Sequence, residues 1–145
     1  MRSVLRFSLV LFPLIAAYPA SAQSLEAGRW RVMTTTLSEA HKPPMVATRC
    51  LTAEDVADLG KTFGPQSTTE NLECRRTEFS QNSEGMTWRL QCRGQIDVDV
   101  SAEFIFSSPV RYSALVKTRA TMLDRIVQDN MVSISAERIG ECRPD

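Results

Sequence analysis

The sequence predicts a mainly β fold: an antiparallel meander that forms a curved sheet or a partly closed barrel, with one short helix near residues 52–60. Three observations predict it. Apolar and polar residues alternate over residues 96–106, the period of a strand with one face in water. Four cysteines follow an export-type leader, as in disulfide-bonded domains. A short helical pattern with acidic residues in its first turn begins at Thr52.

Residues 1–22 predict a secretory signal peptide. Arg2 and Arg6 supply a positive start, and Ala20-Ser21-Ala22 is a small-residue cleavage site. The apolar run between them is shorter than the roughly 20 residues that span a bilayer. We therefore expect cleavage after Ala22, a single β-rich domain over residues 23–145, and export to the bacterial periplasm, with secretion as the alternative.

The first elements of the mature chain follow in order. Residues 28–37 and 46–51 are rich in β-branched and aromatic residues and predict two strands. The segment between them contains two prolines and predicts a loop. Thr52 is typical of a helix N-cap, and Gly60 can end the helix.

The later elements continue the antiparallel pattern. Residues 74–92 predict a hairpin with a polar turn around Ser83. Strands follow at residues 96–106, 110–119 and 131–139, while residues 122–130 fit a short helix as well as a strand. This run of adjacent strands predicts the meander.

The cysteines, which are Cys50, Cys74, Cys92 and Cys142, predict two structural disulfides. Folding the hairpin about its turn places Cys74 opposite Cys92, which leaves Cys50 with Cys142; Cys50–Cys74 with Cys92–Cys142 is the alternative. That register puts Phe79 and Trp88 on opposite faces of the hairpin. A β-bulge between the cysteines and the aromatic pair would bring both pairs into register.

Three short motifs, in this order, resemble one bacterial family. They are G-R-W at residues 28–30, C-L-T at residues 50–52 leading into an acidic helix, and R-I-G-E-C at residues 138–142, with two further cysteines between. The pattern resembles the exported family called domain of unknown function 3617, over nearly all of the mature chain. The resemblance implies a small exported protein without an assigned activity, and it supplies no catalytic residue.

Composition and motifs narrow the function. The 17 basic and 17 acidic residues balance, and no basic block indicates nucleic acid. His41 is the only histidine, and no G-x-S-x-G, C-x-x-C or nucleotide-binding loop occurs. We therefore expect no cofactor and no stable membrane insertion after cleavage. The sequence favours a non-enzymatic ligand-binding or protein-interaction module, with a small ligand or another envelope protein as partner.

Two alternatives and one set of ligand candidates stay open. Asp97, Asp99 and Glu103 share one strand face, which would suit a carboxylate-dependent cell-envelope enzyme. His41 and Met45, joined by Met33, would suit a weak copper site. Candidates for binding an anionic ligand are Arg75, Arg76, Arg89 and Arg93.

Overall fold

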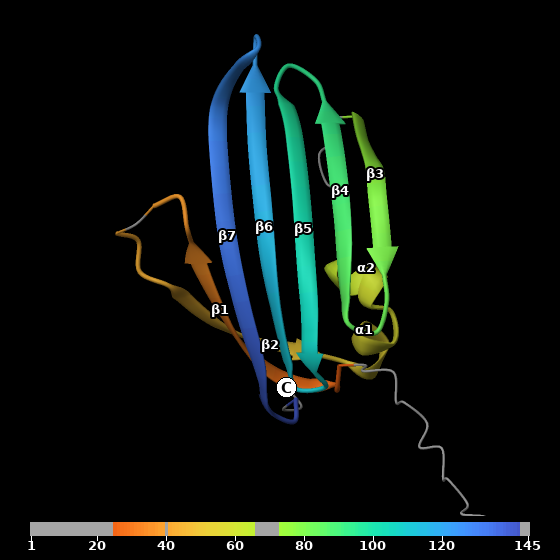
Figure 1. Ribbon diagram of the computed structural model, residues 1–145. Helices are drawn as coiled ribbons and strands as arrows, with labels where there is room; N and C mark the ends of the chain where they lie inside the picture. The colour runs from red at the N-terminus through yellow and green to blue at the C-terminus, as the bar shows by residue number, and fades with distance from the viewer. Residues whose placement is uncertain (1–24, 40, 66–72, 143–145) are drawn as a thin grey trace, which may run out of the picture.

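The computed structural model describes residues 25–39, 41–65 and 73–142, in which seven strands form one antiparallel sheet with two short helices on one face (Figure 1). The predicted signal peptide and its cleavage site lie outside the described residues. The elements are β1 Gly28–Thr36, β2 Met45–Leu51, α1 Ala53–Ala57, α2 Leu59–Phe63, β3 Glu73–Gln81, β4 Gly85–Arg93, β5 Asp97–Ser108, β6 Arg111–Met122 and β7 Arg125–Gly140.

The strand order is β2-β1-β7-β6-β5-β4-β3, and every pair of neighbours is antiparallel. The five strands from β3 to β7 form a meander, each pairing with the next. β7 then pairs with β1, which carries β2 at its far side. The mainly β prediction is confirmed, and of the two predicted forms the sheet is the open one, with β2 and β3 as its edges.

The β3–β4 hairpin contains the predicted bulge. Cys74 lies opposite Cys92 and Phe79 lies opposite Trp88, and the register shifts by one between Arg76 and Glu78. The extra residue lets the disulfide and the aromatic pair each occupy a matched position. At the turn, the Asn82 carboxamide oxygen accepts hydrogen bonds from the backbone N–H groups of Glu84 and Gly85, at 2.9 Å each.

Both disulfides follow the pairing that the hairpin favoured. Cys74–Cys92 joins β3 to β4, and Cys50–Cys142 joins β2 to the chain that follows β7. All four cysteines are bridged.

The helical segment differs from the single predicted helix. Thr52 does cap α1, since its hydroxyl accepts from Asp55 N at 3.2 Å while the Asp55 carboxylate accepts from Thr52 N at 2.8 Å. Asp58 then interrupts the helix, because its carboxylate accepts from Lys61 N at 2.9 Å and starts α2. Gly60 therefore lies inside α2 and does not end it. The end falls at Gly64, where a Cβ atom would collide with the carbonyl oxygen of Gly60.

The ambiguous residues 122–130 form a hairpin. Leu123 and Asp124 make a two-residue turn with φ angles of 49° and 59°, and β7 begins at Arg125, before the predicted start at residue 131. Pairing along β6 extends the strand through a segment whose local pattern also fits a helix.

The core lies between the sheet and α2. We call the sheet face that carries Trp30, Met86, Phe104, Tyr112 and Ala136 the inner face, and the opposite one the outer face; these five side chains are all buried. Phe63 of α2 packs there, with ring centroids 5.3 Å from Phe104 and 5.0 Å from Tyr112. In the described part of the chain, no helix has the length and apolar character needed to cross a membrane.

Removing either disulfide should destabilise the domain, and removing Cys50–Cys142 should cost more. In the chain-entropy model a bridge stabilises more when it closes a longer loop. The bridges span separations of 92 and 18 residues, which gives about 4.6 and about 3.2 kcal/mol. The paired substitutions Cys50→Ala with Cys142→Ala, and Cys74→Ala with Cys92→Ala, should show this order in urea unfolding. The reverse order would contradict the loop-length account.

Replacing Leu123-Asp124 with Asn-Gly should stabilise the protein by about 1 kcal/mol. Side chains with a Cβ are strained at positive φ, and Asn-Gly is favoured in this kind of turn. The readout is the free energy of unfolding in urea. Leu123→Ala is the matched control, because it removes the exposed side chain but keeps the Cβ, and it should give less than half of the gain. An unchanged stability in the Asn-Gly variant would show that the turn is not strained.

Candidate functional site

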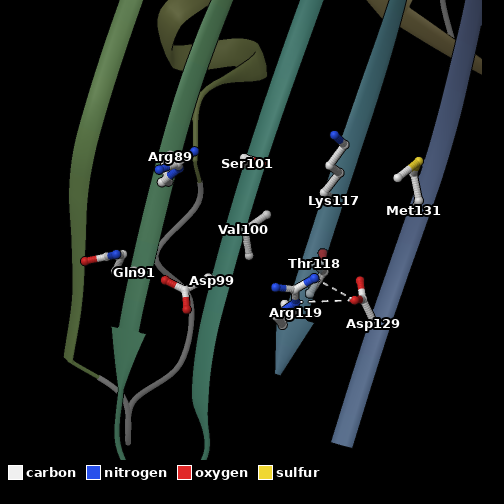
Figure 2. Close-up of a pocket in the computed structure, with 10 residues that line it drawn as sticks. All are labelled: Arg89, Gln91, Asp99, Val100, Ser101, Lys117, Thr118, Arg119, Asp129 and Met131. Atoms are coloured by element: carbon white, nitrogen blue, oxygen red, sulfur yellow. Dashed lines mark hydrogen bonds and ion pairs between the residues drawn. The ribbon is translucent and has the colours of Figure 1, made fainter. Parts of the chain in front are cut away.

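A hollow of about 470 Å³ lies on the outer face (Figure 2). Two cross-strand rows of side chains build it, each with one residue from β4, β5, β6 and β7. The rows are Arg89, Ser101, Lys117 and Met131, then Gln91, Asp99, Arg119 and Asp129. The register of four neighbouring strands therefore gathers three cations and two carboxylates.

Most of these charges are paired, either with one another or with charged residues beside the hollow. Arg119 meets Asp129 at 2.8 Å, and Arg89 meets Glu78 at 3.3 Å. Asp99 is held by Arg93 at 3.4 Å. All of these pairs are solvent-exposed, so each contributes little to stability. An incoming anion would have to compete with the carboxylates already present, which makes this hollow a poor anion site.

The predicted carboxylate group is not brought together. Asp97 and Asp99 both approach Arg93, at 4.0 and 3.4 Å. Glu103 lies four residues beyond Asp99 on the same strand, about 13 Å away at the usual rise per residue. The three acids therefore do not converge on a common point.

The predicted copper ligands also lie apart. Met33 pairs with Val46, and the next residue, Thr34, pairs with Met45. Successive residues of a strand face opposite ways, so Met33 and Met45 lie on opposite faces of the sheet. His41 is exposed in the loop between the two strands. Among the described residues, no group of three or more histidine, cysteine, aspartate or glutamate side chains could hold a metal ion.

The four predicted anion-binding arginines are divided between the two faces. Arg76 is opposite Leu90 on the inner face, with its guanidinium 4.7 Å from the Phe79 ring centroid. Arg75, Arg89 and Arg93 lie on the outer face. Closeness in sequence therefore does not produce one cationic cluster.

A second outer-face hollow, of about 610 Å³, lies over β1, β6 and β7. Arg31 and Glu137 pair across it, and a hydrogen bond from Arg31 lowers the pKa of the Glu137 carboxyl. Strands of the same sheet line it, together with the exposed side chains of Met33 and Val46. With a single layer beneath it, this hollow can cover only one side of a ligand.

The inner face contains a pocket of about 330 Å³ between the sheet and α2. Its walls come from two layers, and most of them are apolar. The lining residues are Val32, Ala47, Arg49, Thr62, Phe63, Gly64, Phe104, Tyr112 and Ile134. This mixture of apolar walls with a few polar groups is typical of small-molecule sites.

Arg49 is the one cation among these lining residues. It pairs with Trp30 in the sheet, and its neighbour Cys50 carries the bridge to Cys142, so its backbone is held from two directions. The guanidinium lies 5.7 Å from the Phe63 ring centroid. Within the described residues no carboxylate approaches it closely enough for an ion pair.

Tyr112 supplies a second polar group. Its ring packs against Trp30 and Phe63, with centroids 5.4 and 5.0 Å away. Burial raises the pKa of the phenol, and the Arg49 charge partly offsets this. The hydroxyl is therefore protonated at neutral pH and can donate a hydrogen bond to a ligand.

Arg49 and Tyr112 were not among the site residues predicted from the sequence. The available signal was strand alternation: Arg49 shares a face with Ala47, and Tyr112 shares one with Ala114, so both polar side chains stand in an apolar row. Alternation alone does not show that the two strands meet α2.

The fold and this pocket define a disulfide-bonded antiparallel β domain with a two-layered apolar site. The chain belongs to the family described as "Protein of unknown function (DUF3617)", whose model matches residues 25–142, and the resemblance stated above is thereby confirmed. No curated protein and no solved structure matched the chain.

The ionisation of Tyr112 should report on the pocket. Cleavage after Ala22 would remove Tyr18 and leave Tyr112 as the only tyrosine. Its pKa is raised in the folded protein, so tyrosinate absorbance should appear at higher pH than in urea, where the value is about 10. The contribution of the neutral phenol to the free energy of unfolding is fully present below about pH 10. It is lost as the pH rises through the folded-state pKa. Tyr112→Phe should abolish the signal, and identical titrations in buffer and urea would contradict the buried position.

Proposed function

We propose that the chain is an exported, non-enzymatic ligand-binding module of the bacterial periplasm, and that its ligand lies in the inner-face pocket. The observation that carries this proposal is the pocket itself, a space of about 330 Å³ bordered by the sheet on one side and by α2 on the other. That volume is at the lower end of the range for small-molecule sites. A small ligand there would touch protein on two sides.

The apolar lining supports binding of an apolar group. Val32, Ile134 and Phe104 come from three different strands and present hydrocarbon to the same space. Burying apolar surface of the ligand there is favourable by roughly 25 cal/mol per Å². The outer-face hollows are weaker candidates because one layer lines them and exposed ion pairs occupy them.

The polar groups of the pocket suit recognition more than catalysis. Arg49 and Tyr112 can bind and orient, since a guanidinium stays charged and a raised phenol pKa keeps its proton. The Thr62 hydroxyl already donates to the Asp55 carbonyl oxygen at 2.8 Å. These groups do not form a nucleophile with an adjacent base.

Export is supported by the disulfides and by the leader pattern. All four cysteines are paired, which fits an oxidising compartment. The periplasmic assignment rests on the bacterial style of the leader in residues 1–22 and on the family resemblance.

Binding of the neutral apolar dye N-phenyl-1-naphthylamine tests the proposal. The wild-type protein should bind the dye with a rise in fluorescence, and Ala47→Phe should weaken binding at least about tenfold by filling the pocket, a change of about 1.4 kcal/mol. Ala47 is exposed on an edge strand, so this variant should fold. Thr48→Phe is the matched control, because it adds the same ring one residue away on the other face. Absence of dye binding, or equal effects of the two variants, would reject the proposal.

A further inference from the structure

Arg49 places a full positive charge at the wall of an apolar pocket. Among the described residues it interacts electrostatically with Asp55 and Tyr112. The Asp55 carboxylate is committed elsewhere, because it accepts hydrogen bonds from Thr52 N and Thr52 Oγ1 at 2.8 and 2.9 Å. Its pKa is lowered chiefly by these Thr52 bonds, with a smaller effect from Arg49. The charge of Arg49 is thus left for a group from outside the described fold.

Tyr112 and Arg49 converge on the same ring. The Phe63 centroid is 5.0 Å from the Tyr112 centroid and 5.7 Å from the Arg49 guanidinium carbon. Within the described residues, no hydrogen bond engages the Tyr112 hydroxyl. A cationic fork and a neutral phenol therefore both border the pocket at Phe63, and each can donate hydrogen bonds to an oxyanion.

The pocket has both apolar lining and polar groups, and together they favour a ligand with an apolar end and an anionic end. A purely apolar ligand would take water from the guanidinium without replacing its hydrogen bonds, which is costly. A small hydrophilic anion would pair with Arg49 but leave the hydrocarbon of Val32 and Ile134 uncovered. A cationic ligand would be repelled. An anionic head on an apolar tail satisfies both walls at once.

The volume limits the tail. A water molecule occupies about 30 Å³ of liquid, and a methylene group is of similar size. The pocket of about 330 Å³ therefore holds a chain of roughly ten such groups. This excludes full enclosure of a two-tailed lipid.

We propose, on the basis of the function proposed above, that the pocket binds a single-chain amphiphile with an anionic head. Arg49 and Tyr112 hold the head group, and the alkyl chain lies along Val32, Phe104 and Ile134. Carboxylate and phosphate both offer oxygens that accept hydrogen bonds from a guanidinium fork. A free fatty acid and a single-chain phosphate ester are the two sources of this chemistry.

The test is competition against the neutral dye with four ligands of equal chain length: decanoate, decyl phosphate, decanol and decyltrimethylammonium. Both anions should displace the dye at concentrations about tenfold below that of decanol, a difference of about 1.4 kcal/mol. The cation should be the weakest competitor. The anion that displaces the dye at the lower concentration identifies the carboxylate or the phosphate as the preferred head group.

Three variants assign the preference to the head-group residues. Arg49→Met should reduce the preference for decanoate over decanol to within about twofold, because it removes a charge-assisted hydrogen bond; this preference is a ratio and does not depend on the affinity of the variant for the dye. Tyr112→Phe should weaken the binding of decanoate by about threefold to tenfold and have little effect on the binding of decanol. Arg111→Met is the control: it removes the same charge next to Tyr112 but on the outer face, and it should change nothing.

The Tyr112 titration gives an independent readout. A bound anion beside the phenol disfavours phenolate, so decanoate should move the tyrosinate absorbance to higher pH, and decanol should move it less. Dye binding with equal competition by decanoate and decanol, or equal effects of Arg49→Met and Arg111→Met, would overturn this inference and leave the proposed function standing. Absence of dye binding would reject both.

Discussion

The inner face depends on how Phe63 is held. A five-residue helix has no stability of its own, because helix nucleation is costly and short helices are marginal in water. Its position is therefore set by tertiary contacts. The Phe63 ring packs among Phe104, Phe106 and Tyr112, and its carbonyl oxygen accepts a hydrogen bond from Trp88 Nε1 at 2.9 Å. These contacts fix both the side chain and the backbone of the residue that forms one wall of the pocket.

The opposite wall comes from an edge strand, which needs a different support. Among the described strands β2 pairs only with β1, and most of its residues are exposed. The Cys50–Cys142 bridge ties β2 to the chain beyond β7. The next residue, Leu51, is fully buried, and Thr52, directly after it, caps α1. The strand, the bridge and the helix cap thus follow one another in consecutive residues, so the position of Arg49 is coupled to that of the helices.

Local patterns predicted the strands, the hairpin and its bulge, since the information lies within each segment. The alternation of residues 96–106 predicted a strand with one face in water, and a bulge was the feature that reconciled the cysteine pair with the aromatic pair, while the disulfide pairing was left with an alternative. The helical segment was harder to predict, because Thr52 and Asp58 can both act as N-caps and the sequence does not show that both are used. The pocket was not predictable from these patterns. It requires β1 to pair with β7, and that long-range pairing is what places Val32 beside Ile134.

Strand alternation also explains why the four predicted arginines do not lie on one face, while Arg49 and Tyr112, which the sequence did not single out, lie close together. Arg75 and Arg76 are adjacent in sequence and so lie on opposite faces, and Arg89 and Arg93 are taken up by acids of the outer face. Arg49 and Tyr112 are distant in sequence but share the inner face and the Phe63 ring. The charges of the outer face are therefore mostly held in exposed ion pairs, whereas on the inner face the Arg49 guanidinium lies over the Phe63 ring. Among the described residues no carboxylate forms an ion pair with Arg49, so an anionic ligand would meet less competition there than at the paired charges of the outer face.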